Sequence, residues 1–157
     1  MTKTLPNFLA NNNAQFVFVG GGDKKYVRKI KALENKFQGK LAAKLEADFE
    51  MPHKLYAGAD FLVLPSISEP FGLVVAEAKR YGVIPIMHAV DGLKDQVVDF
   101  KNGFAFDNYS CLSLESKLVE ALRSFQSEWQ YKLQSKIGLE VASWKKVSSE
   151  WLSYLYA

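Results

Sequence analysis

Residues 59–95, ADFLVLPSISEPFGLVVAEAKRYGVIPIMHAVDGLKD, decide the fold class of this chain. Two short apolar runs, 61–64 and 83–87, flank a stretch with helical spacing at 72–81. Gly82 follows the helical stretch, where glycine commonly ends a helix. Short apolar runs that alternate with amphipathic helices are typical of a parallel sheet covered by helices, so we expect the α/β class.

The same alternation continues on both sides of this stretch. The pattern predicts a strand at 16–19, a helix at 23–37, an edge strand at 40–45, a short helix around 53–56 and a strand at 104–106. From residue 112 onward it is helical, with breaks near Ser127 and Gly138 and an aromatic-rich last helix at about 144–156. We expect residues 1–157 to form a single domain.

The composition is that of an ordinary globular domain, with 48% hydrophobic and 24% charged residues in 157. The net charge of +3 is dispersed, which argues against nucleic acid as a partner and suits an anionic small ligand. The lone Cys111 excludes an internal disulfide, and we expect it in the core of a cytoplasmic protein. No apolar run resembles a signal peptide or a membrane span.

A candidate ligand site lies in the loop after the strand at 61–64. This loop carries Glu69 and Gly72 into a helix, at the carboxyl end of a strand, where open parallel sheets bind ligands. The first helical turn offers free N–H groups and a positive dipole to a phosphate, and Gly72 leaves the approach open. Glu77 adds a second carboxylate, and carboxylates accept hydrogen bonds from sugar hydroxyls. Each glutamate also has a simpler interpretation, as a helix-dipole partner or a solvated surface residue.

Three consecutive glycines and two histidines suggest other functions, which their context disfavours. Gly20, Gly21 and Gly22 lack the third glycine of a dinucleotide fingerprint, because a lysine occupies that position, so NAD binding is disfavoured. We predict a strand-to-helix turn that borders a nucleotide cleft. His53 and His88 are too distant in sequence, without neighbouring cysteines, to indicate a metal site.

The central motifs resemble the donor-site signature of glycogen and starch synthases. They are S-x-x-E-P-F-G-L-x-x-x-E-A at 66–78, R-Y-G-x-I-P-I at 80–86 and D-G-L-K-D at 91–95. Their two glutamates match the E-x7-E pattern of retaining glycosyltransferases, and similarity at 53–60 and 143–156 extends the resemblance over nearly the whole chain. The resemblance implies a Rossmann-like parallel sheet with helices on both faces, the C-terminal half of a two-domain GT-B fold.

The resemblance also implies roles for residues. Glu69 would be catalytic and contact the transferred glucose, and Glu77 would bind the ribose hydroxyls. Backbone groups would hold the distal phosphate, at Phe71, Gly72 and Leu73. The loop of Asp91, Gly92 and Leu93 would lie beside the site, and Phe49 is a candidate for packing on the base.

The implied reaction moves glucose from ADP-glucose or UDP-glucose to an α-1,4-glucan with retention, and needs no metal or other cofactor. Two alternatives stay open: a retaining transferase with a lipid, sterol or protein acceptor, and a non-catalytic nucleotide-binding module. The acceptor would bind through an N-terminal domain that has no counterpart in these 157 residues. We therefore expect no appreciable glucosyl transfer by this chain alone, which a glucan-elongation assay would test.

The first strand of the implied domain also has no counterpart. The family has a strand and a basic loop ahead of the helix that matches residues 2–12. In the doubly wound order this strand is central, between the strands at 16–19 and 61–64. We expect those two strands to pair directly, with insertion of a segment from another chain as the alternative.

Overall fold

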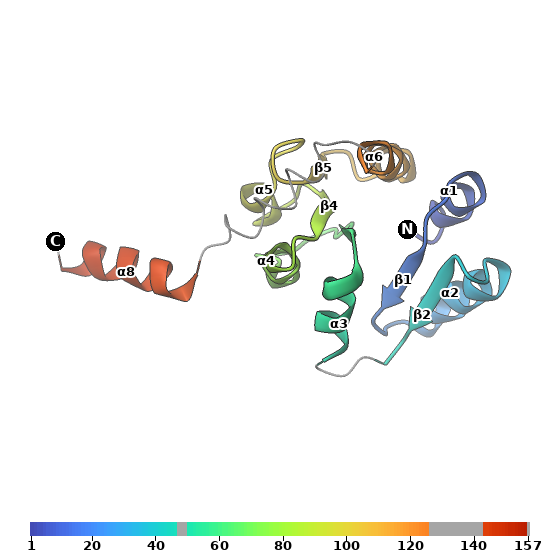
Figure 1. Cartoon of the computed structure of the whole chain (residues 1–157), viewed down its shortest axis with the longest axis horizontal. Helices are drawn as coiled ribbons and strands as arrows, with labels where there is room; N and C mark the ends of the chain where they lie inside the picture. Colours follow the sequence, from blue (N-terminus) through green and yellow to red (C-terminus); the bar gives the residue numbers. More distant parts are fainter. Residues whose placement is uncertain (47–49, 126–142, 157) are drawn as a thin grey trace.

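The computed structural model describes residues 1–46, 50–125 and 143–156 (Figure 1). Helices and strands alternate along the chain, as the sequence pattern predicts. In order they are α1 (Leu5–Asn11), β1 (Phe16–Val19), α2 (Lys24–Lys36), β2 (Leu41–Lys44), α3 (Met51–Gly58), β3 (Phe61–Leu64), α4 (Leu73–Arg80), β4 (Ile84–His88), α5 (Leu93–Gln96), β5 (Phe104–Phe106), α6 (Cys111–Ser124) and α8 (Trp144–Leu155).

Each predicted strand is present, with boundaries shifted by a residue or less. Pro65 follows the end of β3, and Gly82 takes a positive φ of 78° directly after α4 and its cap residue. Gly82 N–H donates to Lys79 C=O at 3.0 Å, which closes the helix as a C-terminal glycine does. The predicted breaks at Ser127 and Gly138, and the position of Phe49, lie outside the described residues.

The strands form two separate parallel sheets. β1 pairs with β2, in a register that places Phe16 opposite Leu41, and the second sheet has the order β3-β4-β5. No pairing joins β1 to β3. The expected direct pairing of these two strands is therefore wrong. Residues 1–13 contain α1 and no strand, so they do not occupy the central position either.

The packing of α1 explains why the two strands stay apart. α1 contacts α6, and its apolar side chains belong to one core cluster with residues of β4 and α6 (Figure 1). Phe8 also packs edge-on against Phe16 of β1, with ring centroids 5.8 Å apart. Direct pairing of β1 with β3 would require α1 to slide over this core. The cluster is built from Leu5, Phe8, Leu9, Leu41, Ile84, Ile86, Phe104, Phe106, Leu114, Leu118 and Ala121.

β4 is the most deeply buried strand, and helices cover both of its faces. All five residues of its sequence IPIMH are buried. Ile84 and Ile86 face α6, whereas Met87 packs in a second cluster with Val75 of α4 and Leu93 of α5. A strand buried on both faces needs a continuous apolar sequence, which is the pattern that predicted it.

One expected core residue lies on the surface. Cys111 is exposed as the first residue of α6, directly after the cap residue Ser110. The Ser110 hydroxyl accepts the Ser113 N–H at 3.0 Å. This start of the helix turns Leu114 and Leu118 toward the core and leaves Cys111 in solvent. The expectation that Cys111 is buried is therefore wrong.

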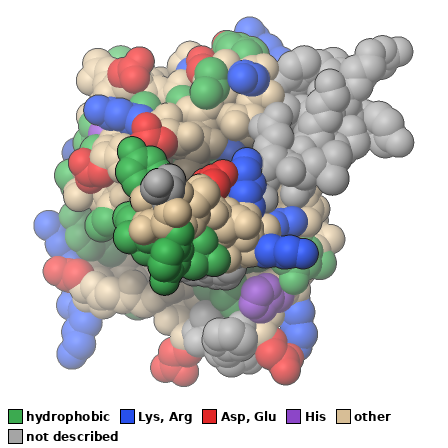
Figure 2. All heavy atoms as spheres, turned by 90° about the vertical axis from the view of Figure 1, so that its left-hand side faces the viewer, with side chains coloured by type: hydrophobic (Ala, Val, Ile, Leu, Met, Phe, Trp, Pro, Cys, Tyr) green, Lys and Arg blue, Asp and Glu red, His purple; other side chains and the backbone are tan. Residues whose placement is uncertain are grey.

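α8 stands apart from the rest of the molecule, at the left of Figure 1. Its end faces the viewer in Figure 2, where hydrophobic side chains gather on it. The exposed side chains include Trp151, Leu152, Tyr154, Leu155 and Tyr156. No helix in the described part of the chain combines the length and the hydropathy that crossing a membrane requires.

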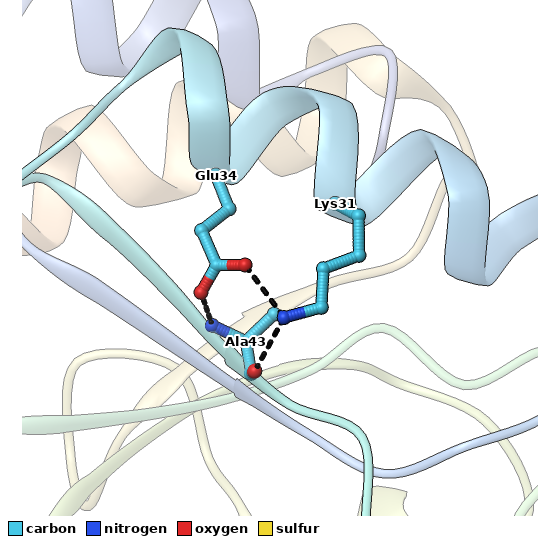
Figure 3. Close-up of polar contacts among 3 residues, drawn as sticks. All are labelled: Lys31, Glu34 and Ala43. Carbon is cyan, nitrogen blue, oxygen red and sulfur yellow. Dashed lines mark hydrogen bonds and ion pairs between the residues drawn. The ribbon is translucent and has the colours of Figure 1, made fainter.

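Side chains cover the outer edges of both sheets. In Figure 3, Glu34 of α2 accepts the Ala43 N–H of β2 at 2.8 Å, and Lys31 bridges Glu34 to the Ala43 carbonyl. At the opposite edge, Asp99 accepts the Ala105 N–H of β5 at 2.9 Å. Edge strands with free backbone groups invite association, and these contacts occupy them.

Candidate functional site

The candidate site begins where β3 enters α4. Gly72, at the N-cap of α4, has φ 79° and ψ 57°, a left-handed conformation that favours glycine. The Val75 N–H donates back to the Gly72 carbonyl at 2.9 Å. Within the described residues, no acceptor is recorded for the N–H groups of Leu73 and Val74, whose side chains are also exposed. The first turn of α4 therefore presents two backbone donors.

Glu69 lies against this helix start. The Gly72 N–H donates to Glu69 Oε1 at 3.1 Å, and the Glu69 side chain is half-buried. A carboxylate at this position interacts favourably with the helix dipole. The contact seen in the structure is the one expected of a helix-dipole partner, the simpler interpretation of Glu69. The Glu69 carboxylate can still accept further hydrogen bonds.

Asp91 fixes the backbone that carries Glu69. The Ser68 hydroxyl donates to Asp91 Oδ2 at 2.7 Å, and the Glu69 N–H donates to the same oxygen at 3.0 Å. These two hydrogen bonds, Ser68 first, hold the pKa of Asp91 below its ordinary value. Asp91 itself has φ 44°, an uncommon backbone conformation for a residue other than glycine. The 91–93 loop therefore lies beside the 68–72 loop, as the sequence resemblance implied.

The two loops pack so closely that two glycines are required. A Cβ on Gly92 would overlap the backbone carbonyl of Pro70, and a Cβ on Gly72 would overlap the Leu93 side chain. Leu93 is fully buried, so its side chain belongs to the core and supports the loop from below. Gly72 is thus required by packing and backbone conformation. The sequence suggested that Gly72 keeps the approach to the helix start open for a phosphate, but the structure gives packing against Leu93 as the reason for glycine at this position.

Gln96 is a residue that the sequence analysis missed. Its amide Nε2 donates to the Phe71 carbonyl, and the Lys79 ammonium donates to the Gln96 carbonyl. Asn102 Nδ2 donates to the same carbonyl at 3.3 Å. Gln96 ends the short helix α5, so it anchors the 68–72 loop to α4 and α5 together. No motif signals this role, because Phe71 and Lys79 lie 25 and 17 residues from Gln96 and meet it only in the fold.

Glu77 is exposed on α4 and turns toward α3. Burial, and then the charge of Glu77 and a hydrogen bond to it, raise the pKa of Tyr56 above its ordinary value. Tyr56 also packs against the ring of Tyr81, with centroids 5.9 Å apart. Glu77 therefore lies close to Tyr56 of the neighbouring helix α3, and no recorded contact joins it to Glu69.

The glycine turn after β1 is a separate feature, with no recorded hydrogen bond to these loops among the described residues. Gly20 and Gly22 have φ of 124° and 147°, and both have open space where a Cβ would lie. No hydrogen bond is recorded between this turn and the loops at 68–72 or 91–93. A surface hollow of about 680 Å³ lies elsewhere, between α1 and α6, and includes Asn7 and Glu115.

His88 joins the ends of two strands. Its Nδ1 lies 2.8 Å from the Ser66 carbonyl, and its Nε2 lies 3.2 Å from the Asp107 carbonyl. The buried ring also stacks near Tyr109, with centroids 5.1 Å apart. His53 instead contacts Tyr81, the C-cap residue of α4. Among residues 1–46, 50–125 and 143–156, no cluster of His, Cys, Asp and Glu has the makings of a metal site.

These contacts make a fixed loop with a defined chemistry. Two free N–H groups at a helix start suit one phosphate, and the adjacent carboxylate suits a hydroxyl-bearing group attached to it. Asp91 and Gln96 hold the loop from both sides. Such an arrangement could accept an anionic ligand that carries hydroxyl groups.

Comparisons with known proteins identify the family of this chain. Residues 2–137 match the family described as "Glycosyl transferases group 1". The chain is 32% identical to the glycogen synthase of Lacticaseibacillus casei (strain BL23), over 97% of the chain and 33% of that protein. It is 38% identical to the glycogen synthase of Thermodesulfovibrio yellowstonii, over 83% of the chain and 26% of that protein.

The fold has counterparts among solved structures. The catalytic domain of starch synthase IV from Arabidopsis thaliana, bound to ADP and acarbose, aligns with a TM-score of 0.76 and 26% identity, over 88% of this chain and 31% of that chain. Parallel sheets with helices on both faces match the GT-B glycosyltransferase fold. The chain spans about a third of the length of the curated relatives it matches. This chain is a glycosyltransferase domain and belongs to the group 1 glycosyltransferase family.

Proposed function

We propose that the loops at 68–72 and 91–93 form the nucleotide-sugar site of a retaining glucosyltransferase, with ADP-glucose or UDP-glucose as the donor. The observation that carries this proposal is the pair of free N–H groups at Leu73 and Val74, adjacent to the carboxylate of Glu69. The helix start would bind the distal phosphate, and the glucose attached to that phosphate would lie beside Glu69.

Glu69 and Glu77 take different roles in this proposal. Glu69 would exchange its hydrogen bond with the Gly72 N–H for one with a glucose hydroxyl. Glu77 would bind the ribose hydroxyls, with Tyr56 of α3 close to its carboxylate. The glycine turn at 20–22 and the backbone of Phe71 would border the same ligand.

The acceptor belongs to the wider proposal. The glycogen synthase relatives support an α-1,4-glucan acceptor, and the starch synthase that aligns with this chain was solved with ADP. Since the chain spans 33% of one such relative, the acceptor would bind to polypeptide outside the part that is matched. We propose no metal or other cofactor and no nucleic-acid partner for this site.

The test is an NMR titration of the isotope-labelled 157-residue chain with ADP, UDP, ADP-glucose and UDP-glucose. We expect shifts of the Leu73 and Val74 amides, with dissociation constants on the order of millimolar, or about 4 kcal/mol. Glu77→Ala should weaken the binding of all four ligands, because each of them carries the ribose. Glu69→Ala should weaken only the sugar-bearing ligands, because a diphosphate alone does not reach the sugar position.

Glu150→Ala on α8 is the control, because Glu150 is an exposed carboxylate far along the chain from these loops. It should leave all four titrations unchanged. Comparison of the adenine and uracil series identifies the base. Equal losses for Glu69→Ala with diphosphate and with diphosphate-glucose would contradict the assigned roles, and unshifted Leu73 and Val74 amides would contradict the site itself.

A further inference from the structure

His88 is a buried histidine whose two ring nitrogens both face acceptors. Its Nδ1 lies 2.8 Å from the Ser66 carbonyl, and its Nε2 lies 3.2 Å from the Asp107 carbonyl. Only 8% of the residue is exposed. A neutral imidazole carries one N–H group, whereas the imidazolium carries two. The neutral ring can therefore donate to one of these carbonyls, and only the charged ring can donate to both.

The two carbonyls belong to segments that β4 separates in the sheet. Ser66 follows β3 and Asp107 follows β5, on either side of β4 in the order β3-β4-β5. His88 is the last residue of β4, so its ring spans the carboxyl ends of three adjacent strands. The charged ring thus ties the segment after β3 to the segment after β5, and loss of its proton releases one of the two.

Aromatic side chains pack against the ring from the side of β5. The ring centroids of Phe106 and Tyr109 lie 5.5 Å and 5.1 Å from that of His88. Burial by itself favours the neutral imidazole, but an aromatic ring attracts a cation at such a distance. The segment after β5 also brings two titratable groups, the Tyr109 phenol and the exposed carboxylate of Asp107. The surroundings on this side therefore suit a positive charge.

Asp91 faces the ring from the adjacent loop. Hydrogen bonds from the Ser68 hydroxyl and the Glu69 N–H are the main causes that lower the pKa of Asp91, and the positive charges of Lys94 and His88 lower it further. The attraction between Asp91 and His88 also stabilises the imidazolium. His88 is therefore joined to the loop of Ser68 and Glu69 twice, through the carbonyl ahead of that loop and through the charge of Asp91.

We propose that His88 is a positioning residue whose proton sets the order of the 68–72 loop and, through it, the affinity for a nucleotide-sugar. The charged ring holds both strand ends and attracts Asp91, so the loop keeps the arrangement seen in the structure. Its positive charge also attracts a diphosphate, for which the 68–72 loop itself offers no basic side chain. The effect on affinity rests on the proposed function, whereas the tie between the strand ends does not.

The first measurement uses the ligand-free chain. Nitrogen–proton correlation spectra report how many nitrogens of the His88 ring carry a proton, and protection factors against hydrogen exchange report the order of the loop at the Glu69 and Gly72 amides. Between about pH 8 and about pH 5.5, which brackets the ordinary titration of histidine, we expect the ring to gain its second proton. Both protection factors should rise by about fivefold or more, while that of Phe18 in the other sheet stays constant.

The second measurement is the binding of ADP-glucose and UDP-glucose at the same two pH values, because their substituted diphosphates do not titrate in this range. We expect binding to be about fivefold or more tighter at the lower pH. His88→Gln can donate to a carbonyl but cannot become charged, so it should bind equally at both pH values, with the affinity of the unsubstituted chain at the higher pH.

Two further variants complete the comparison. His88→Arg carries a permanent charge and several donors, and it should bind at both pH values with the affinity of the unsubstituted chain at the lower pH. His53→Gln removes the other of the two histidines, which contacts Tyr81, and should retain the full pH dependence. The ring spectra and protection factors of the unsubstituted chain keep the proposal testable if a variant at His88 does not fold.

Three results would overturn the proposal. The first is a His88 ring whose protonation does not change between the two pH values. The second is a change of ring protonation without any change in the protection of Glu69 and Gly72. The third is nucleotide-sugar binding that is equal at both pH values, or a pH dependence that His88→Gln retains. Binding of neither nucleotide-sugar at either pH would contradict the proposed function and the effect on affinity together, and the ligand-free measurements would still decide whether His88 ties the strand ends.

Discussion

Substitution of Gly92 by alanine should damage both stability and ligand binding. Gly92 has φ −68° and ψ −13°, which alanine adopts without strain, so the backbone conformation adds no penalty. The added Cβ would overlap the Pro70 carbonyl and approach Phe71 Cα to 3.1 Å. Both neighbours are backbone atoms, which cannot rotate away as a flexible side chain would.

The magnitude follows from this geometry. Overpacking costs about 1–3 kcal/mol, and the upper part of the range applies where the obstacle is backbone. Relief of the overlap would push the 68–72 loop away from Asp91, so binding at Leu73 and Val74 should weaken as well. Urea unfolding measures the stability, and the ADP-glucose titration measures the binding.

Gly58→Ala is the matched control. Gly58 ends α3 with nothing within 4 Å of its added Cβ, so alanine should be neutral or stabilise by about 0.4–1 kcal/mol. If Gly92→Ala unfolds within about 0.5 kcal/mol of the unsubstituted chain, the inferred close packing of the two loops is refuted.

Three further predictions concern the contacts around these loops. Folding lowers the pKa of Asp91 below its ordinary value of 3.8. The stability that Asp91 contributes is therefore present above pH 3.8 and is lost as the pH falls through the pKa of the folded state. The loss of stability on acidification should be less steep in Asp91→Asn. Glu77→Gln should lower the pKa of Tyr56 toward its ordinary value, because the charge of Glu77 is one cause of its rise; spectrophotometric titration of the phenol measures the change. Gln96→Ala should speed exchange of the hydrogen-bonded Gly72 and Val75 amides in NMR, whereas Gln96→Glu should not restore protection, since a carboxylate cannot donate to the Phe71 carbonyl.

Much of the local structure could be predicted from sequence, because its causes are local. The apolar runs at 16–19 and 61–64 specify strands, and Pro65 and Gly82 end elements through their own backbone restrictions. The motif around Glu69 placed a carboxylate at a helix start, where the structure also has it. Burial of Cys111 was predicted wrongly, since the start of α6 sets which side of the helix faces the core.

The contacts that build the site could not be predicted in the same way. The resemblance placed the 91–93 loop beside Glu69, but it did not indicate that Asp91 would bond the Glu69 N–H or that Gln96 would hold Phe71. These partners lie more than 20 residues apart, and their distance depends on how β3 and β4 align. Side-chain hydrogen bonds of this kind follow from the assembled loops, so no local pattern encodes them.

The sequence by itself determined the α/β class, the order of the elements and the family, because periodicity and motif spacing are local properties of the chain. Only the tertiary structure decided that the strands form two sheets and that β1 and β3 remain unpaired. Strand pairing depends on where helices pack, and the core between α1, α6 and β4 fixes the two sheets apart. The distance between two strands is set by the helices and core side chains packed around them, and the residues of the strands themselves do not specify that packing.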